Sequence, residues 1–180
     1  MKTRVEISKL VHDARSGDKE AVGVLYDTFV DAVYRFVYFR VSTREDAQDL
    51  TEETFVSIFE HIGTYNERGL PFEAWVYRIT RNKIIDYYRS KKKTVSLEES
   101  ADYPDEKQNP ERETERQLTK EYIMDCVRHL PESYQEIIIL KYIEDKTNEE
   151  ISELLDKPLA HVRVLQSRAV QKLRTIVDHD

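Results

Sequence analysis

The chain has 180 residues, of which 39% are apolar and 35% charged, with a formal net charge of −7. This length suits one ordinary domain or two small ones, and the low glycine and proline content favours a helical fold over a turn-rich β fold. No apolar run approaches the roughly 20 residues of a membrane span, and the N-terminus lacks a signal-peptide pattern.

The charge distribution indicates two domains joined by an acidic linker. Residues 1–93 carry a net charge of +1, residues 94–117 carry −5 and residues 118–180 carry −3. The segment 94–110 contains few large apolar residues and two prolines, so it cannot bury enough surface to become ordered. We therefore expect domains at 1–93 and 111–180 and a flexible linker at 94–110.

Four helices are predicted in the N-terminal domain. The first spans about Arg4–Arg15, and the second follows Asp18, a typical N-cap residue. The third follows a cap at Ser42 or Thr43 and ends near Ile62. The fourth runs from Phe72 to Lys93, with Pro71 well placed at its start. Four helices with short connections predict a small bundle.

The fourth predicted helix concentrates positive charge in an otherwise acidic chain. Between Trp75 and Lys93 it carries seven basic residues and one acid, Asp86, which we expect to pair with Arg89 or Asn82. Aromatic residues are interleaved with the basic ones, a pattern that suits a phosphate backbone with unstacked bases beside it. Three apolar residues of this helix are expected in the core: Trp75, Val76 and Ile79.

The C-terminal domain shows a helix-turn-helix pattern. Helices are predicted at about 111–129 and 133–143, and Thr147 with Glu150 forms a capping box that opens a short helix. A turn at 156–158 precedes the last helix, which has basic residues opposite its apolar stripe. The predicted fold class is therefore all-α, with two small helical domains.

Four motifs in order resemble the extracytoplasmic-function (ECF, group 4) bacterial RNA polymerase sigma factors of the sigma-70 family. The segment 46–55, DAQDLTEETF, is similar to the family's region 2.2, and 72–82, FEAWVYRITRN, is similar to regions 2.3 and 2.4. Leu130-Pro131-Glu132 and Glu149-Glu150-Ile151 fall where region 4 carries its own motifs. The resemblance implies a four-helix region 2 and a helix-turn-helix region 4. It also implies a role in transcription initiation, with RNA polymerase core and promoter DNA as partners.

The third predicted helix is the expected contact with the polymerase. Asp46, Asp49 and Glu53 share one helical face, which suits a basic partner surface. The resemblance implies that this surface meets the β′ clamp helices and that region 4 meets the β flap. The expected polymerase-binding residues are Asp46, Asp49, Leu50, Glu52, Glu53 and Phe55. Glu52 stands where the family usually has glutamine.

The loop before the basic helix, and the helix itself, are the expected contacts with the −10 promoter element. Promoter opening requires a pocket for a base flipped from the melted strand, with cations along its backbone. Tyr65, Asn66 and Arg68 are the candidates for holding the base. The candidates for the DNA backbone and base edges are Arg78, Arg81, Asn82 and Arg89.

The last predicted helix is the expected contact with the −35 element, with its N-terminal residues foremost in the major groove. The candidate residues are Lys157, His161, Arg163 and Arg168. The chain departs from the family at Asp156, where the turn usually has glycine, and at Leu165, where arginine is common. Leu165 either removes a DNA contact or shifts the inward face of the helix by one residue.

Other classes of function remain open from the residues alone. The chief alternative is a helix-turn-helix transcriptional regulator that does not engage polymerase core. A nucleic-acid enzyme with a metal at Asp46 and Asp49 is disfavoured, because these acids lie on a helix with acidic neighbours and are better explained as a solvated face. A purely protein-binding module does not explain the basic helix. No catalytic residue, metal or other cofactor is expected, because neither a catalytic constellation nor a zinc-type spacing is present. The single cysteine, Cys126, excludes an internal disulfide and indicates a cytoplasmic protein. An anti-sigma factor is a possible partner, and the free chain could mask its own DNA-binding face, with the acidic linker as one route.

Overall fold

The computed structural model describes residues 2–66, 69–95 and 115–178, and every regular element within them is helical. The all-α prediction is confirmed. The N-terminal domain comprises α1 (Arg4–Arg15), α2 (Lys19–Tyr38), α3 (Arg44–His61) and α4 (Phe72–Val95), with a short 3₁₀ turn at Ile62–Thr64. The C-terminal domain comprises α5 (Glu115–Arg128), α6 (Glu132–Ile138), a π-helical turn at Ile139–Ile143, α7 (Asn148–Leu155) and α8 (Leu159–Val177).

Local capping chemistry starts the helices where the sequence predicts. Asp18 accepts hydrogen bonds from the backbone of Glu20 and Ala21 at the start of α2, and Thr43 accepts one from Asp46 at the start of α3. Thr147 and Glu150 form the reciprocal capping box that opens α7. Each of these bonds satisfies a backbone donor that would otherwise lack a partner.

The predicted linker, 94–110, lies almost wholly outside the described residues. Only its first two positions are described, as the end of α4, which runs to Val95. The expected start of the C-terminal domain at 111 also lies outside them, because the description resumes with α5 at Glu115.

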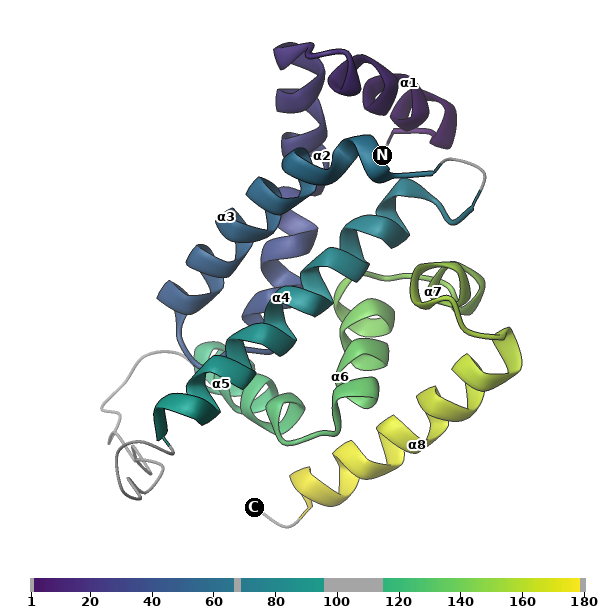
Figure 1. The fold of residues 1–180 in the computed structure, drawn as a ribbon. Helices are drawn as coiled ribbons and strands as arrows, with labels where there is room; N and C mark the ends of the chain where they lie inside the picture. Colours follow the sequence, from purple (N-terminus) through teal and green to yellow (C-terminus); the bar gives the residue numbers. More distant parts are fainter. Residues whose placement is uncertain (1, 67–68, 96–114, 179–180) are drawn as a thin grey trace.

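The two domains are packed against each other around one continuous hydrophobic core. Buried residues of both domains belong to the same cluster, among them Phe36 and Tyr77 in the N-terminal domain and Ile137 and Leu140 in the C-terminal domain. α4 lies between α3 on one side and α6 and α7 on the other (Figure 1). From this central position α4 contacts helices of both domains.

The second helix of the C-terminal domain is interrupted, which the sequence did not indicate. The expected continuous helix at 133–143 is instead α6 followed by the π-helical turn. Four consecutive residues, 137–140, are buried, so this segment is covered on every side. It is enclosed because it contacts α8 and α5 within its own domain while the π turn contacts α2.

No helix within the described residues has the length and apolar character that a membrane span requires.

Candidate nucleic-acid interface

An exposed acidic face runs along α3. Asp49, Glu52 and Glu53 are all exposed, and the carboxylate of Glu53 lies 3.7 Å from Nζ of Lys83 on α4. This pair is at the surface, where such contacts contribute at most about 1 kcal/mol. The three acids are therefore available to a basic partner.

Asp46 differs from the other acids because its carboxylate joins α3 to α4. It accepts hydrogen bonds from Tyr87 (2.7 Å), Thr43 (2.7 Å) and Lys91 (3.3 Å). Burial opposes its ionisation, but these donors together hold the pKa of Asp46 below its ordinary value. Burial, together with the hydrogen bond to Asp46, raises the pKa of Tyr87. Asp46 thus fixes the end of the basic helix against the acidic one.

The apolar residues predicted for this surface lie inside the domain. Leu50 and Phe55 are both buried, and the ring of Phe55 packs against Tyr26. The exposed apolar side chain on α3 is instead Val56, which is 58% exposed. Val56 was not among the predicted polymerase-binding residues. Its spacing of three and four residues from Glu53 and Glu52 nevertheless places it on the acidic face.

A cavity of about 310 Å³ lies between the loop that follows α3 and the first turns of α4. Its lining includes four of the predicted −10 residues: Tyr65, Asn66, Arg78 and Arg81. Tyr65 is buried, its ring packs against Phe72 and Trp75, and its hydroxyl donates to the backbone of Leu70. Arg68 lies outside the described residues.

The loop that forms one wall of this cavity is anchored from α1. The guanidinium of Arg15 donates hydrogen bonds to the backbone oxygens of Gly63 (2.6 Å) and Tyr65 (3.0 Å). A charged donor holding two carbonyl oxygens restricts the loop, so the cavity has a preformed wall.

Three of the predicted DNA-contacting residues form one exposed stripe on α4. Arg78, Asn82 and Arg89 are exposed and follow helical spacing, with exposed Ile85 between the last two. The predicted ion pair between Asp86 and Arg89 is present at 3.5 Å. Trp75 and Val76 are buried, and Ile79 packs against the core, as predicted.

The helix-turn-helix of the C-terminal domain is held by a tight turn. Asp156 adopts the left-handed conformation, with φ of 51°, at the position where the resemblance expects glycine. Aspartate is one of the few residues that tolerates this conformation. The hydroxyl of Ser152 donates to the backbone oxygen of Lys157 at 2.6 Å and ties α7 to the turn.

The exposed face of α8 carries the predicted −35 residues. His161, Arg163 and Arg168 are exposed, whereas Lys157 is partly buried. Arg163 lies 3.5 Å from Glu149, with both side chains largely solvent-exposed. Leu165 is buried together with Val162 and Ala169, so it belongs to the inward face of the helix.

Val164 lies among the exposed −35 candidates and was not predicted. Its side chain is exposed, one position after Arg163 and three after His161. An apolar side chain at such a position can contact the methyl group of thymine. The signal in the sequence was the shift of the apolar pattern by one residue at Leu165.

One predicted DNA-contacting residue is engaged by the other domain. The guanidinium of Arg81 lies 3.8 Å from the carboxylate of Glu136 on α6. Glu136 is buried and also lies 3.5 Å from the buried guanidinium of Arg40. Burial raises the pKa of Glu136, although Arg40, Arg81 and Lys157 favour its charged form.

Within the described residues, no three or more histidine, cysteine, aspartate or glutamate side chains are grouped in a way that suits a metal ion.

Comparison with known proteins gives matches in both domains. The family described as sigma-70 region 2 matches residues 25–94, and the family described as sigma-70 region 4 matches residues 120–173. The chain is 33% identical over 174 residues to the ECF RNA polymerase sigma factor BldN of Streptomyces coelicolor, covering 96% of this chain and 66% of that protein. It therefore spans just under two thirds of that relative's length.

A second relative is covered more completely. The chain is 27% identical over 155 residues to the ECF RNA polymerase sigma factor SigM of Bacillus subtilis, covering 84% of this chain and 92% of that protein. Among solved structures, CnrH in complex with the cytosolic domain of CnrY has a TM-score of 0.71 at 23% identity, over 95% of this chain and 96% of that one, which shows a shared fold. With region 2 and region 4 matched in order over more than half of its residues, the chain belongs to the sigma-70 family, as a factor of the ECF type.

Proposed function

We propose that this chain binds bacterial RNA polymerase core as an ECF sigma factor, directs it to promoters and helps to open the duplex at the −10 element. In this proposal residues 1–93 bind core and the −10 element, residues 111–180 bind the −35 element, and residues 94–110 connect them. Its site of action is then the cytoplasm, where the polymerase works.

The observation that carries the proposal is that one helical bundle exposes two separate surfaces of opposite charge. The acids Asp49, Glu52 and Glu53 are exposed on α3, whereas Arg78, Asn82 and Arg89 are exposed along α4. A protein that only bound DNA would have no use for an exposed acidic face beside its basic helix. A sigma factor needs both, one for the β′ clamp helices and one for the promoter.

At the polymerase surface, charge would steer the encounter and Val56 would supply apolar contact. Exposed ion pairs contribute little affinity, so a buried apolar anchor is needed at the centre of the interface. Leu50 and Phe55 then act from inside, by holding the exposed residues of α3 in place. Asp46 acts in the same way through its bonds to α4.

At the −10 element, the cavity beside α4 would receive a base flipped from the melted strand. Asn66, which lines the cavity, would contact the base, while Tyr65 forms part of the wall. Arg68, outside the described residues, stays a predicted contact of the base. Stacking on an aromatic ring contributes about 1–3 kcal/mol per base, comparable with the few kcal/mol that unstacking costs. Arg78, Arg81, Asn82 and Arg89 would hold the backbone, and no bond chemistry is required.

At the −35 element, α8 would enter the major groove with His161, Arg163 and Arg168 toward the DNA. Lys157 would contribute from the turn before the helix. The C-terminal domain would also meet the β flap of the polymerase. An anti-sigma factor that covers these surfaces stays a further predicted partner, and the proposal assigns the chain no catalytic residue and no cofactor.

A capture experiment with purified RNA polymerase core tests the proposal. We expect the wild-type chain to capture core at fixed, stated salt, and the variant Asp49→Lys/Glu53→Lys to lose capture. The matched control is Glu20→Lys/Asp27→Lys, which makes the same charge change at two exposed positions on α2. If the wild type binds DNA but captures no core, the proposal fails and the independent helix-turn-helix regulator replaces it.

A further inference from the structure

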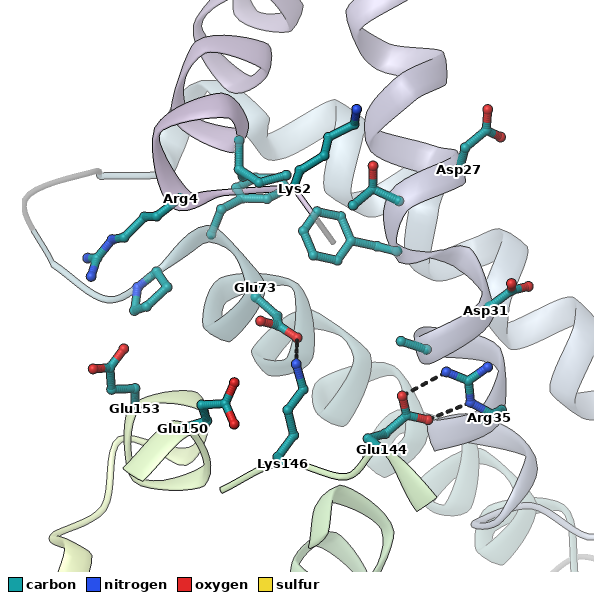
Figure 2. Close-up of a pocket in the computed structure, with 16 residues that line it drawn as sticks. Lys2, Arg4, Asp27, Asp31, Arg35, Glu73, Glu144, Lys146, Glu150 and Glu153 are labelled. Carbon is teal, nitrogen blue, oxygen red and sulfur yellow. Dashed lines mark hydrogen bonds and ion pairs between the residues drawn. The ribbon is translucent and has the colours of Figure 1, made fainter. Parts of the chain in front are cut away.

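Besides the shared hydrophobic core, several ion pairs join the N-terminal domain to the C-terminal domain. Figure 2 shows Glu144 and Lys146, which lie just before α7, reaching Arg35 of α2 and Glu73 of α4. The Arg35–Glu144 pair is bidentate, with nitrogen–oxygen distances of 2.6 and 2.8 Å. Lys146 lies 2.8 Å from Glu73.

A second group of interdomain pairs centres on Arg40, just after α2. Its buried guanidinium donates to Glu132 at 2.7 Å and lies beside Glu136. The hydroxyl of Tyr88 on α4 donates to the backbone oxygen of Arg40. We call the pairs of Arg35, Glu73 and Arg40 with their C-terminal partners the interdomain seam.

The seam brings acids of the C-terminal domain to the proposed −10 site. Glu136 lies 3.8 Å from Arg81, and Asp156, in the turn before α8, lines the same cavity as Asn66, Arg78 and Arg81. A carboxylate in this place occupies cationic surface that would otherwise hold a phosphate of DNA. The polymerase-binding face differs, because α3, which carries the exposed acids and Val56, lies on the other side of α4 from α6 and α7 (Figure 1).

We propose that the C-terminal domain acts in cis as a competitor of DNA, with Glu136 and Asp156 against Arg81 and the base cavity while the interdomain seam is closed. In the closed form, the −10 site is blocked to single-stranded DNA, whereas the acidic face of α3 stays accessible to polymerase core. This inference rests on the proposed function of the −10 site and adds its regulation.

The seam has the properties of a reversible contact. Buried ion pairs lose much of their attraction to the cost of removing charges from water, so they specify a geometry more than they stabilise it. The raised pKa of Glu136 reflects that cost. A cavity of about 520 Å³, lined by charged residues of both domains, also remains beside the Arg35 and Glu73 pairs. A closed form populated at about 90% would weaken apparent DNA binding about tenfold, since the apparent Kd scales inversely with the competent fraction.

The first test opens the seam away from the DNA-contacting residues. Glu144→Arg places two arginines against each other, and Arg35→Glu/Glu144→Arg restores the pair in reverse. Asp125→Arg is the matched control, because it makes the same charge change on the C-terminal domain at an exposed residue whose ion pair is with His129, just after α5. Binding is measured by fluorescence anisotropy with a labelled 20-nucleotide single-stranded DNA of random sequence, and opening by the radius of gyration from X-ray scattering.

We expect Glu144→Arg to show a larger radius of gyration and about tenfold tighter DNA binding than Asp125→Arg, and the double variant to return to wild-type values. An opened Glu144→Arg that binds DNA no better than the control would overturn the proposal. An unchanged radius of gyration would also overturn it, because the shared hydrophobic core would then keep the domains closed without the Arg35–Glu144 pair.

A second variant tests the competitor directly without opening the seam. Asp156→Asn removes the charge beside the base cavity and keeps a residue that tolerates the left-handed conformation. We expect it to bind the same single-stranded DNA several-fold tighter than Asp125→Asn, and equal binding would count against the proposal. Core capture, measured in parallel, should be retained in all these variants, because none of them changes the acidic face of α3. Loss of capture by the wild type would instead refute the proposed function.

Discussion

At the scale of single residues, the hydrogen bond from Tyr87 to Asp46 gives the sharpest prediction for stability. Tyr87→Phe removes a donor from a charged acceptor, so we expect the free energy of unfolding to fall by about 1 kcal/mol at pH 7. The pKa of Asp46 is depressed in the folded chain, so this stabilisation is present above the unfolded-state value near 3.8 and is lost as the pH falls through the lower folded-state pKa.

Urea unfolding of the wild type and Tyr87→Phe at pH 7 and near pH 3 measures this difference. The control is Tyr26→Phe, because the Tyr26 ring packs edge-on against Phe55 and its hydroxyl forms no hydrogen bond within the described residues. If Tyr87→Phe lowers the free energy of unfolding equally at both pH values, the hydrogen bond to Asp46 is not the source of the lost stability.

Val56 gives a second prediction at this scale, for polymerase binding. An apolar anchor at the centre of an interface is commonly worth 1–2 kcal/mol or more, so Val56→Ser should weaken capture of core about tenfold. Because Val56 is exposed, the melting temperature should hardly change. Val5→Ser, at an exposed valine on α1, is the matched control. Equal capture by Val56→Ser and Val5→Ser would exclude Val56 from the interface.

At the scale of helices, the sequence predicted the features that depend on residues close in sequence, such as the helix caps. Asp18, Thr43 and Thr147 cap their helices as expected, because a cap bonds to backbone only two or three residues away. The π-helical turn at 139–143 was not predictable in this way, since it lies where the segment is enclosed by α8, α5 and α2 together. Likewise, Leu50 and Phe55 follow the motif of the exposed face, but packing in three dimensions buries them.

The exposed face of α8 gives the prediction at this scale. Arg163→Ala should weaken binding to duplex DNA of mixed sequence and reduce the slope of log K against log salt by about 1, as expected for the loss of one phosphate contact. Arg174→Ala removes the same charge about 16 Å further along the helix, beyond the proposed contact, and should leave the slope unchanged. Titrations at several salt concentrations distinguish the two, and an identical slope for both variants would contradict the proposed orientation of α8.

At the scale of the whole molecule, the sequence predicted two domains but not how they meet. The seam joins residues as far apart as Arg35 and Glu144, which are separated by 109 positions, and no local pattern links them. The acidic linker was the expected route by which the chain could mask its DNA-binding face, but it lies almost wholly outside the described residues. Within them, Glu136 and Asp156 of the C-terminal domain lie at that face instead.

If the seam is closed in the free chain, polymerase core and DNA must bind cooperatively. Core that engages α3 and gives the C-terminal domain a second attachment favours the open form, and by linkage it raises the affinity of the −10 site. Core should therefore raise the DNA affinity of the wild type more than that of Glu144→Arg, because Glu144→Arg is already open. We expect the roughly tenfold advantage of Glu144→Arg to fall to about twofold or less with saturating core.

The measurement is the anisotropy of the labelled single-stranded DNA with and without core, corrected for core alone. The control combines Glu144→Arg with Asp49→Lys/Glu53→Lys and is expected not to bind core. Adding core should therefore leave its affinity for the labelled DNA unchanged. An advantage of Glu144→Arg that persists undiminished with core would mean that polymerase does not open the seam. Opening would then require a different partner, because the N-terminal residues of the seam lie on α2 (Arg35), just after it (Arg40) and on α4 (Glu73), away from the acidic face of α3 that core is proposed to bind.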